Sequence, residues 1–292
     1  MKNNTGLIIY GEALFDCFPD GQQILGGAPF NVAWHLQALN NQPLFISRVG
    51  NDALGRKIIS ALSDWGINTH TIQIDPEHQT GQVAVKLVEN EPLYTITANC
   101  AYDFISTTEL DSLPDKGILY HGTLGLRNMV SKNCLAHISQ KSELSIFLDV
   151  NLRSPWWEKH EVLNWMGRAR WVKLNKDEFE QLGFGSADNE QNMHHVKKQF
   201  QLEQLIVTQA AQGATILAAD DKIYQQTPKK IEHFVDTVGA GDGFSALFIH
   251  ALLAGWPASK TLNVAQIFAS KVIGLQGAIA TDATFYQKFI SL

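Results

Sequence analysis

The sequence predicts an α/β protein with a mostly parallel central sheet and a smaller group of strands beside it. Short apolar segments of strand length alternate with segments whose apolar residues recur at helical spacing, most clearly after residue 117. Two extended segments, 82–89 and 93–98, interrupt this alternation without a helix between them. Glycines and polar residues collect where the predicted strands end, which is the edge at which open α/β sheets bind ligands.

The first half of the chain is expected to supply three strands and two helices of the main domain. The apolar run after the N-terminus stops at Gly11, as a short buried strand does, and Glu12, Asp16 and Asp20 follow it. Pro29 fits the first turn of a helix, because its missing N–H would have no partner there. The expected strands are Leu7–Tyr10, Leu44–Val49 and Ile67–Ile74, and the expected helices begin at Pro29 and span Ala53–Trp65.

The two extended segments in the middle of the chain alternate apolar with smaller or polar residues, which is the period of half-exposed strands. Asn90-Glu91-Pro92 between them is expected to be a hairpin turn. We therefore expect a small sheet that stands off the main domain, as a lid over the active site, as an oligomer interface, or as both.

The second half of the chain repeats the order of strand and helix more regularly. Asn175 follows an apolar strand and is a suitable N-cap for the next helix. The expected strands are Ile118–His121, Leu144–Val150, Trp171–Leu174 and Leu205–Thr208, with a hairpin of Ala214–Ala219 and Ile223–Gln226. The expected helices span Ser131–Gln140, begin at Pro155, and span Asn189–Phe200, Ser259–Leu275 and Thr284–Ile290.

Composition limits the class of protein and its partners. With 292 residues the chain is long enough for one large domain or for one domain with an appendage. A content of 45% hydrophobic and 18% charged residues is ordinary for a soluble globular protein. Its formal net charge of −6 argues against nucleic acid or an anionic membrane as the main partner. The three cysteines lie far apart and form no CxxC motif, which favours a reducing cytoplasm. We expect no signal peptide, and no apolar run of the sequence approaches the roughly 20 residues that a membrane span needs.

A glycine-rich stretch near the C-terminus, Asp236 to Phe244, is the strongest functional signal. Gly239, Ala240 and Gly241 are followed by an apolar run of helical length, so the loop is expected to begin a buried helix. Unpaired N–H groups at such a helix start suit an anion, and Asp242 lies beside them. A phosphate site next to a carboxylate base is what a kinase requires. An ordinary glycine turn with Asp242 at the helix end is the alternative.

Two further groups of polar residues occur at expected strand ends or helix starts. Asp16 and Asn31, with Gly26 and Gly27 between them, could bind vicinal hydroxyls of a sugar, although both polar residues could also be simple caps. Asn175 and Glu178 form the second group. Open α/β sheets gather such residues at the carboxyl edge of their strands.

Other nucleotide and metal motifs are missing from the sequence. There is no GxxxxGK[ST], which argues against a P-loop protein, and no GxGxxG after the first strand, which argues against an NAD-linked oxidoreductase. His194 and His195 lack a third ligand at metal spacing and are expected to be a solvated pair.

The chain resembles the PfkB family of carbohydrate kinases over nearly its whole length. The match rests on the following motifs in the family's order: Gly26-Gly27-x-x-x-Asn31, Gly50-x-Asp52-x-x-Gly55, Asn175-x-x-Glu178, and Asp236-Thr237-Val238-Gly239-Ala240-Gly241-Asp242. The resemblance implies a ribokinase-like, three-layer αβα fold as a single domain over residues 1–292. It also implies a small β lid whose strands are inserted at roughly 12–25 and 80–104.

The resemblance implies a role for each matched residue. Asp242 would be the general base, and the N–H groups of Gly239, Ala240 and Gly241 would form the anion hole. Asn175 and Glu178 would hold Mg²⁺ through water. The sugar would be bound by Asp16, Gly26, Gly27, Asn31 and Asp242, and ATP by Asn175, Thr208, Gly213, Thr237, Gly239, Gly241 and Asn263.

Within the family the chain is most similar to fructokinases, through Gly11-Glu12-Ala13-Leu14-Phe15-Asp16 and Asp149-Val150-Asn151-Leu152-Arg153. It departs from the family by Ala210 in place of glycine, by Val150 in place of proline, and by a lid segment 94–103 without arginine. Phosphorylation of fructose to fructose 6-phosphate is the first expectation. Ribose, 2-keto-3-deoxygluconate and aminoimidazole riboside are alternative substrates, and a catalytically silent sugar sensor is another alternative. Activation by a monovalent cation such as K⁺ and a homodimer formed through the lid are further candidates.

Overall fold

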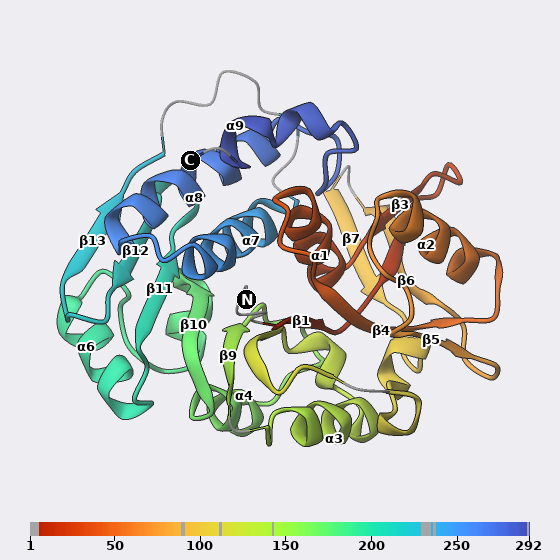
Figure 1. The fold of residues 1–292 in the computed structure, drawn as a ribbon, viewed down its shortest axis with the longest axis horizontal. Coiled ribbons are helices and arrows are strands. Elements are labelled where there is room, and N and C mark those ends of the chain that lie inside the picture. The colour runs from red at the N-terminus through yellow and green to blue at the C-terminus, as the bar shows by residue number, and fades with distance from the viewer. Residues whose placement is uncertain are drawn as a thin grey trace, which may run out of the picture.

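The computed structural model describes residues 6–88, 91–110, 113–141, 143–228, 235, 238–290 and 292. Within these ranges a nine-stranded sheet forms the centre of the molecule (Figure 1). It is parallel from β11 to β5, and β12 and β13 extend it antiparallel at one edge. In spatial order the strands are β13 (Ile223–Gln226), β12 (Ala214–Leu217), β11 (Gln204–Thr208), β10 (Ala169–Asn175), β9 (Glu143–Asp149), β8 (Lys116–His121), β1 (Gly6–Tyr10), β4 (Leu44–Gly50) and β5 (Ile72–Asp75).

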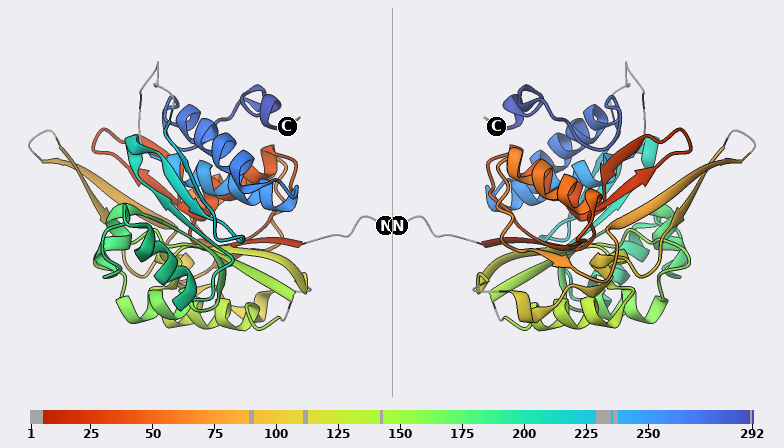
Figure 2. Two further views of the ribbon diagram at one scale, coloured as in Figure 1. Left: turned by 90° about the vertical axis from the view of Figure 1, so that its left-hand side faces the viewer. Right: turned by 90° about the vertical axis from the view of Figure 1, so that its right-hand side faces the viewer.

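Helices cover both faces of this sheet, which gives the expected three layers (Figure 2). Alternate side chains of one strand enter the two cores: Ile9 of β1 packs into one cluster and Ile8 into the other. One face carries α1 (Ala28–Ala38), α2 (Ala53–Asp64), α7 (Ala240–Leu253), α8 (Ala258–Val272) and α9 (Gln287–Ile290). The other carries α3 (Met129–Ile138), α4 (Lys159–Met166), α5 (Lys176–Gln181) and α6 (Glu190–Gln199).

A second sheet of four strands, within the same described ranges, projects from the main body (Figure 2). In spatial order its strands are β3 (Gln23–Gly26), β2 (Leu14–Cys17), β6 (Gly81–Val88) and β7 (Glu91–Ile96). Both segments expected to form the lid thus contribute strands to one small sheet. The sheet is mixed, because β2 and β6 run parallel while the other pairs are antiparallel.

The structure differs from the sequence expectations at four places, of which the first three lie before residue 160. Ile67, expected to begin a strand, instead closes the C-terminal cap of α2, and the strand begins at Ile72. The Ile67 N–H donates a hydrogen bond of 2.9 Å to the Leu62 carbonyl, and Gly66 before it has φ 82, which together form a Schellman motif. The helix expected from Pro155 begins at Lys159. Pro92, expected in a turn, is part of β7, whereas Asn90 lies outside the described residues.

The final expected helix, over residues 284–290, is also interrupted. A 3₁₀ turn at Ala283–Phe285 precedes the short α9, because Asp282 caps that turn through the N–H of Thr284. In the part of the chain that the structure describes, every helix is too short or too polar to cross a membrane.

The motif Gly50-x-Asp52-x-x-Gly55 joins α2 to the start of the small sheet. The Asp52 carboxylate accepts hydrogen bonds of 2.8 Å from the N–H of Gly55, from the N–H of Thr80 and from the Thr80 hydroxyl. A Cβ at position 55 would lie 2.1 Å from the Gly50 carbonyl oxygen, so glycine is required there. This motif therefore has a structural explanation, since Thr80 directly precedes β6.

Replacing Asp52 with asparagine is expected to lower the free energy of unfolding at pH 7 by about 1–2 kcal/mol. Burial alone would raise the pKa of Asp52, but the hydrogen bonds from Thr80 and Gly55 lower it below its usual value. Such a lowered pKa stabilises the fold above the unfolded-state pKa, and this stabilisation is lost as the pH falls. The difference from wild type should thus begin to shrink as the pH falls below about 4, and it should be lost as the pH falls through the lower pKa of the folded state. Urea denaturation at several pH values measures the difference in the free energy of unfolding. Asp64→Asn, a substitution at an exposed position, is the control.

Candidate active site

Two helices that are far apart in the sequence bring an amide and a carboxylate together. Asn31 lies in the first turn of α1 and Asp242 in the first turn of α7. The Asn31 Nδ2 donates a hydrogen bond of 2.7 Å to the Asp242 Oδ2. Burial raises the pKa of Asp242 to about 6, although the Asn31 hydrogen bond opposes that rise. A fixed carboxylate with a pKa close to neutrality is suited to accept a proton from a ligand.

The glycine pair before α1 lies beside Asp16. Gly27 is the N-cap of α1 with φ 106, and a Cβ there would lie 2.6 Å from the Glu12 carbonyl oxygen. A Cβ at position 26 would lie 3.8 Å from the Asp16 Oδ2, across the β2–β3 pair. The Asn31 N–H bonds the Gly27 carbonyl at 2.9 Å, which ties this group to the Asn31–Asp242 contact. The structure therefore brings together the residues that the sequence assigns to a sugar site.

The glycine loop begins helix α7, as expected. Gly239 is its N-cap residue with φ 78, and the Gly239 carbonyl accepts a hydrogen bond of 2.8 Å from the N–H of Gly243. A Cβ at position 239 would lie 2.3 Å from the Cβ of Ala278, so no side chain fits there. The N–H groups of Ala240 and Gly241 belong to the first turn of a 14-residue helix, where the backbone has no intrahelical acceptor. Together with the helix dipole they can bind an anion.

A buried ion pair lies next to this helix start. The Lys173 Nζ donates hydrogen bonds of 2.8 and 2.9 Å to the two carboxylate oxygens of Asp149, and the Ser245 hydroxyl donates one of 2.7 Å to the same carboxylate. The Lys173 and Asp149 side chains are only 8% and 2% exposed, so water screens their charges weakly. A Cβ on Gly241 would lie 3.4 Å from the Lys173 Nζ. The ammonium group is thereby fixed beside the anion-binding end of α7.

Asn175 and Glu178 form a reciprocal cap at the end of β10. The Asn175 Oδ1 accepts from the Glu178 N–H and the Glu178 Oε2 accepts from the Asn175 N–H, both at 2.8 Å. The Glu178 Oε1 accepts a further bond of 2.8 Å from the Leu152 N–H. The carboxylate is therefore held rigidly, and each of its oxygens keeps one lone pair.

A metal at this place would need most of its ligands from elsewhere. Among the described residues there is no cluster of three histidine, cysteine, aspartate or glutamate side chains able to hold an ion. A single fixed carboxylate, that of Glu178, fits Mg²⁺, which keeps several waters and takes phosphate oxygens as ligands. The residues present thus fit an ion carried by a nucleotide and not a protein cage.

The loop after β11 contains the residues expected to contact a nucleotide. Thr208 ends β11 and lies opposite Asn175 in register. The Gln209 N–H donates a hydrogen bond of 2.7 Å to the carbonyl of Gly213, which has φ 100. Ala210 has φ 46, a left-handed conformation that costs a non-glycine residue roughly 1–2 kcal/mol. The alanine thus adopts the conformation that a glycine would favour at this position.

Two other positions expected to contact ATP are Asn263 and Thr237. Asn263 is exposed on α8 and takes no part in the hydrogen bonds described above. Thr237, expected to contact ATP, and Asp236 lie outside the described residues.

Sequence reasoning assigned no role to Lys173 or Ser245, and it singled out Glu12 only as a carboxylate after the first strand. Lys173 has a detectable signal, because a charged residue inside the apolar strand Trp171–Leu174 must find a partner when buried. Glu12 directly follows the first strand, where carboxylates often contact ligands. Ser245 carries no signal, since nothing in its neighbours indicates that its hydroxyl contacts Asp149.

The chain is similar to known carbohydrate kinases. A model of the pfkB family of carbohydrate kinases matches residues 17–284. The chain is 28% identical over 296 residues to the fructokinase of Klebsiella pneumoniae, with 96% of this chain and 94% of that protein covered. It is 26% identical over 258 residues to the aminoimidazole riboside kinase of Salmonella typhimurium, with 84% and 80% covered.

Solved structures show the same fold. The fructokinase of Vibrio cholerae O395, with fructose, ADP and calcium bound, superposes with a TM-score of 0.82 at 25% identity, covering 97% of this chain and 98% of that one. The aminoimidazole riboside kinase of Salmonella enterica, in complex with aminoimidazole riboside and an ATP analogue, superposes with a TM-score of 0.81 at 21% identity, covering 98% and 100%. These likenesses confirm the ribokinase-like α/β fold expected from the sequence.

Proposed function

The chain belongs to the pfkB family of carbohydrate kinases, and we propose that it is an ATP-dependent fructokinase that forms fructose 6-phosphate. Its family makes it a phosphotransferase that acts on a sugar hydroxyl. The contact between Asn31 and Asp242 carries the proposal, because it holds a proton acceptor at the start of the helix whose N–H groups can bind a phosphate.

In the proposed reaction a primary hydroxyl of the sugar gives its proton to the Asp242 carboxylate while its oxygen attacks the γ-phosphorus of ATP. The bond between that phosphorus and the bridging oxygen breaks, and ADP leaves with the electron pair. The N–H groups of Gly239, Ala240 and Gly241 donate to the phosphate oxygens, and the Lys173 ammonium adds positive charge beside them. Positioning and charge stabilisation are the main means by which proteins assist such a transfer.

Fructose is the proposed substrate because the chain matches several proteins named fructokinase along most of its length. Asp16, Gly26, Gly27 and Asn31 would bind its hydroxyls. Aminoimidazole riboside is the second candidate, supported by a relative of 26% identity and by the corresponding solved structure. Ribose and 2-keto-3-deoxygluconate stay as further alternatives.

The proposed cofactors are ATP and Mg²⁺. Asn175, Thr208 and Gly213, together with the glycine loop, would bind the nucleotide, and Glu178 would hold the ion through water. A Vibrio cholerae fructokinase is known with ADP and calcium, and its double mutant with ADP and potassium, so we also propose stimulation by K⁺. ATP and free sugar as substrates suit a cytoplasmic enzyme, and we propose that the small sheet closes over them as a lid.

The proposed function is tested by coupled measurement of ADP release with Mg-ATP over a panel of sugars. The panel contains fructose, ribose, aminoimidazole riboside and 2-keto-3-deoxygluconate. The highest kcat/KM is expected for fructose. A higher kcat/KM for another sugar would replace the substrate, whereas no turnover on any sugar, with sugar binding retained, would favour a silent sensor.

The kcat/KM for the sugar is expected to fall below about pH 6, by about tenfold per pH unit. The base must be ionised to act, and burial raises the pKa of Asp242 to about 6. Asn31→Ala should move this decline to higher pH, because it removes the hydrogen bond that favours the ionised carboxylate. A pH profile of both proteins measures the shift, and a decline at the same pH in both would contradict the assignment.

A further inference from the structure

Three buried polar side-chain atoms near the candidate active site have no hydrogen-bond partner within the part of the chain that the structure describes. The atoms are the Glu12 Oε2, the Tyr102 hydroxyl and the Arg127 Nη1. Glu12 and Tyr102 are 3% and 0% exposed, and the Arg127 side chain is 5% exposed. Leaving buried polar atoms unbonded is costly, so three such atoms in one region indicate a place where a ligand supplies the hydrogen bonds.

Glu12 places this group beside the acceptor side of the active site. Its carbonyl oxygen contacts Gly27, and a Cβ at Gly125 would lie 3.3 Å from its Oε2. Burial raises the pKa of Glu12 to about 7, the charge of Arg153 lowers it, and the charge of Asp242 raises it further. The carboxylates of Glu12 and Asp242 are therefore close enough to influence each other.

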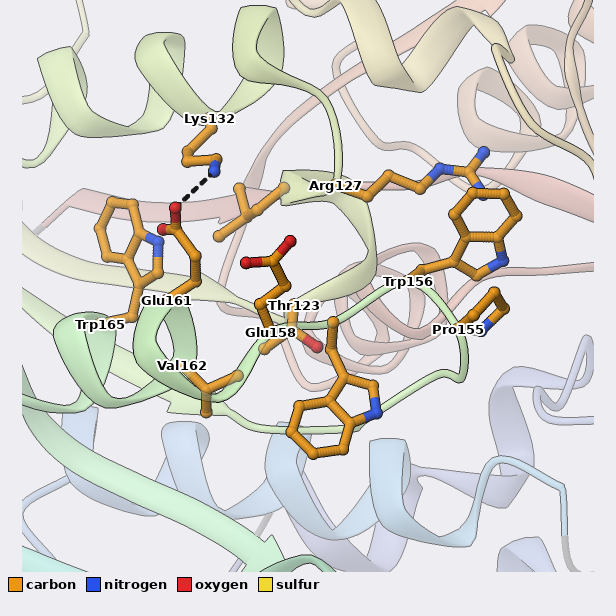
Figure 3. A pocket seen from close by; sticks show the side chains of 11 residues that line it. Thr123, Arg127, Lys132, Pro155, Trp156, Glu158, Glu161, Val162 and Trp165 are labelled. Carbon is orange, nitrogen blue, oxygen red and sulfur yellow. Dashed lines mark hydrogen bonds and ion pairs between the residues drawn. The ribbon is translucent and has the colours of Figure 1, made fainter. Parts of the chain in front are cut away.

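Arg127 is held rigidly and its charge is already neutralised. Its Nε and Nη2 donate hydrogen bonds of 2.7 and 2.8 Å to the Asp103 carboxylate. The guanidinium carbon lies 5.0 Å from the centre of the Tyr102 ring and 4.5 Å from the Trp156 ring. Figure 3 shows Arg127 beside Trp156. Both residues line a cavity of about 260 Å³, which Glu12 and Tyr102 do not line. Only the Nη1 is left to donate to a ligand.

The hydrogen-bonding capacities of the three groups suit a ligand that carries hydroxyls. The Glu12 carboxylate accepts, the Arg127 Nη1 donates, and the Tyr102 hydroxyl can do either, so hydroxyls that both donate and accept satisfy all of them. A ligand carboxylate would instead meet the charge of Asp242, which is ionised above about pH 6, and that of Glu12, which is ionised above about pH 7. The Arg127 charge is paired with Asp103, and Arg153 is the positive charge that acts on both carboxylates.

We propose that Glu12, Tyr102 and Arg127 form a subsite that binds hydroxyls of an uncharged sugar and selects against sugar acids. This inference rests on the proposed sugar kinase function and narrows its substrate class. Fructose, ribose and other neutral sugars are accepted, and 2-keto-3-deoxygluconate is disfavoured by its carboxylate.

The test compares wild type with Glu12→Gln on fructose, ribose and 2-keto-3-deoxygluconate with Mg-ATP. Wild type should prefer a neutral sugar. In the variant the ratio of kcat/KM for the neutral sugar to that for the sugar acid should fall by about tenfold or more, mainly through the KM for the neutral sugar, while the KM for ATP stays unchanged. Wild-type preference for the sugar acid, or a ratio within about twofold of wild type in the variant, would overturn the subsite and leave the kinase function intact.

A second variant, Tyr102→Phe, tests the subsite even if Glu12→Gln fails to fold. Tyr102→Phe removes a hydroxyl only and should raise the KM for the neutral sugar about threefold or more. Tyr10→Phe is the matched control, because it also removes a buried hydroxyl, and the Tyr10 hydroxyl donates its hydrogen bond to the Ser131 carbonyl. The KM of this control for the neutral sugar should equal that of wild type. Equal KM values for the two variants would overturn the subsite. No turnover on any sugar by wild type would overturn the proposed function and, with it, this inference.

Discussion

Replacing Asp242 with asparagine is expected to lower kcat by about 10²–10⁴-fold, because asparagine cannot accept the proton of the sugar hydroxyl. The side chain keeps its size, so the dissociation constant for the sugar should change by no more than about threefold. Coupled ADP release measures the first quantity and calorimetric titration of the sugar the second. Turnover close to the wild-type rate would show that Asp242 is not the base.

The stability of Asp242→Asn separates loss of the base from loss of the fold. Burial raises the pKa of Asp242 to about 6, so the folded protein disfavours its ionised form. Above that pH the ionised Asp242 carboxylate lowers the stability of the folded wild type. Because Asp242 is partly exposed to solvent, which screens its charge, we expect this loss of stability to be about 1–2 kcal/mol. The variant should therefore be more stable than wild type at pH 7 and equal to it below about pH 4. A variant less stable than wild type at pH 7 would contradict this.

Replacing Lys173 with methionine is expected to lower the free energy of unfolding by about 3–5 kcal/mol, because it leaves the Asp149 carboxylate buried without its counter-ion. The kcat should fall as well, since the ammonium next to Gly241 stabilises charge on the transferring phosphate in the proposed mechanism. Denaturation by urea measures the first effect and coupled ADP release the second.

The double variant Asp149→Asn/Lys173→Met distinguishes these two contributions. Removing both charges should restore most of the lost stability, because replacing a whole buried ion pair is often close to neutral. The asparagine can still accept the hydrogen bond from Ser245. The kcat should stay low, because the positive charge beside the glycine loop is gone. Wild-type activity in the double variant would show that Lys173 acts only through the fold.

The fold was largely predictable because its strands and helices have clear periodicity. β1 and β8 are short apolar runs, and α2 has one apolar face. Two of the errors occurred where an apolar residue outside any helix or strand packs against a nearby element or side chain. Ile67 closes the end of α2, and Trp156 packs on Arg127 in a loop before α4. Hydrophobic patterns alone do not distinguish such contacts from the start of a new element.

The active site was predictable in its residue types but not in its contacts. The residues from Gly239 to Asp242 indicated phosphate and proton chemistry, with an ordinary glycine turn as the alternative, and the family resemblance then implied a role for each of them. That Asp242 contacts Asn31 could not be predicted, because the two are 211 residues apart and meet only when α1 and α7 pack together. The same holds for Lys173 and Asp149, which pair across neighbouring strands, and for Glu12 near Arg127.

The most direct test of the central claim is ³¹P NMR of the product formed from Mg-ATP and fructose by wild type and by Asp242→Asn, side by side. The account predicts that wild type converts the γ-phosphate signal into that of a phosphate monoester coupled to the methylene protons of a primary carbon. It predicts formation of the same signal about 10²-fold or more slowly by the variant. Inorganic phosphate as the sole product of wild type, or equal rates of ester formation by both proteins, would contradict the account.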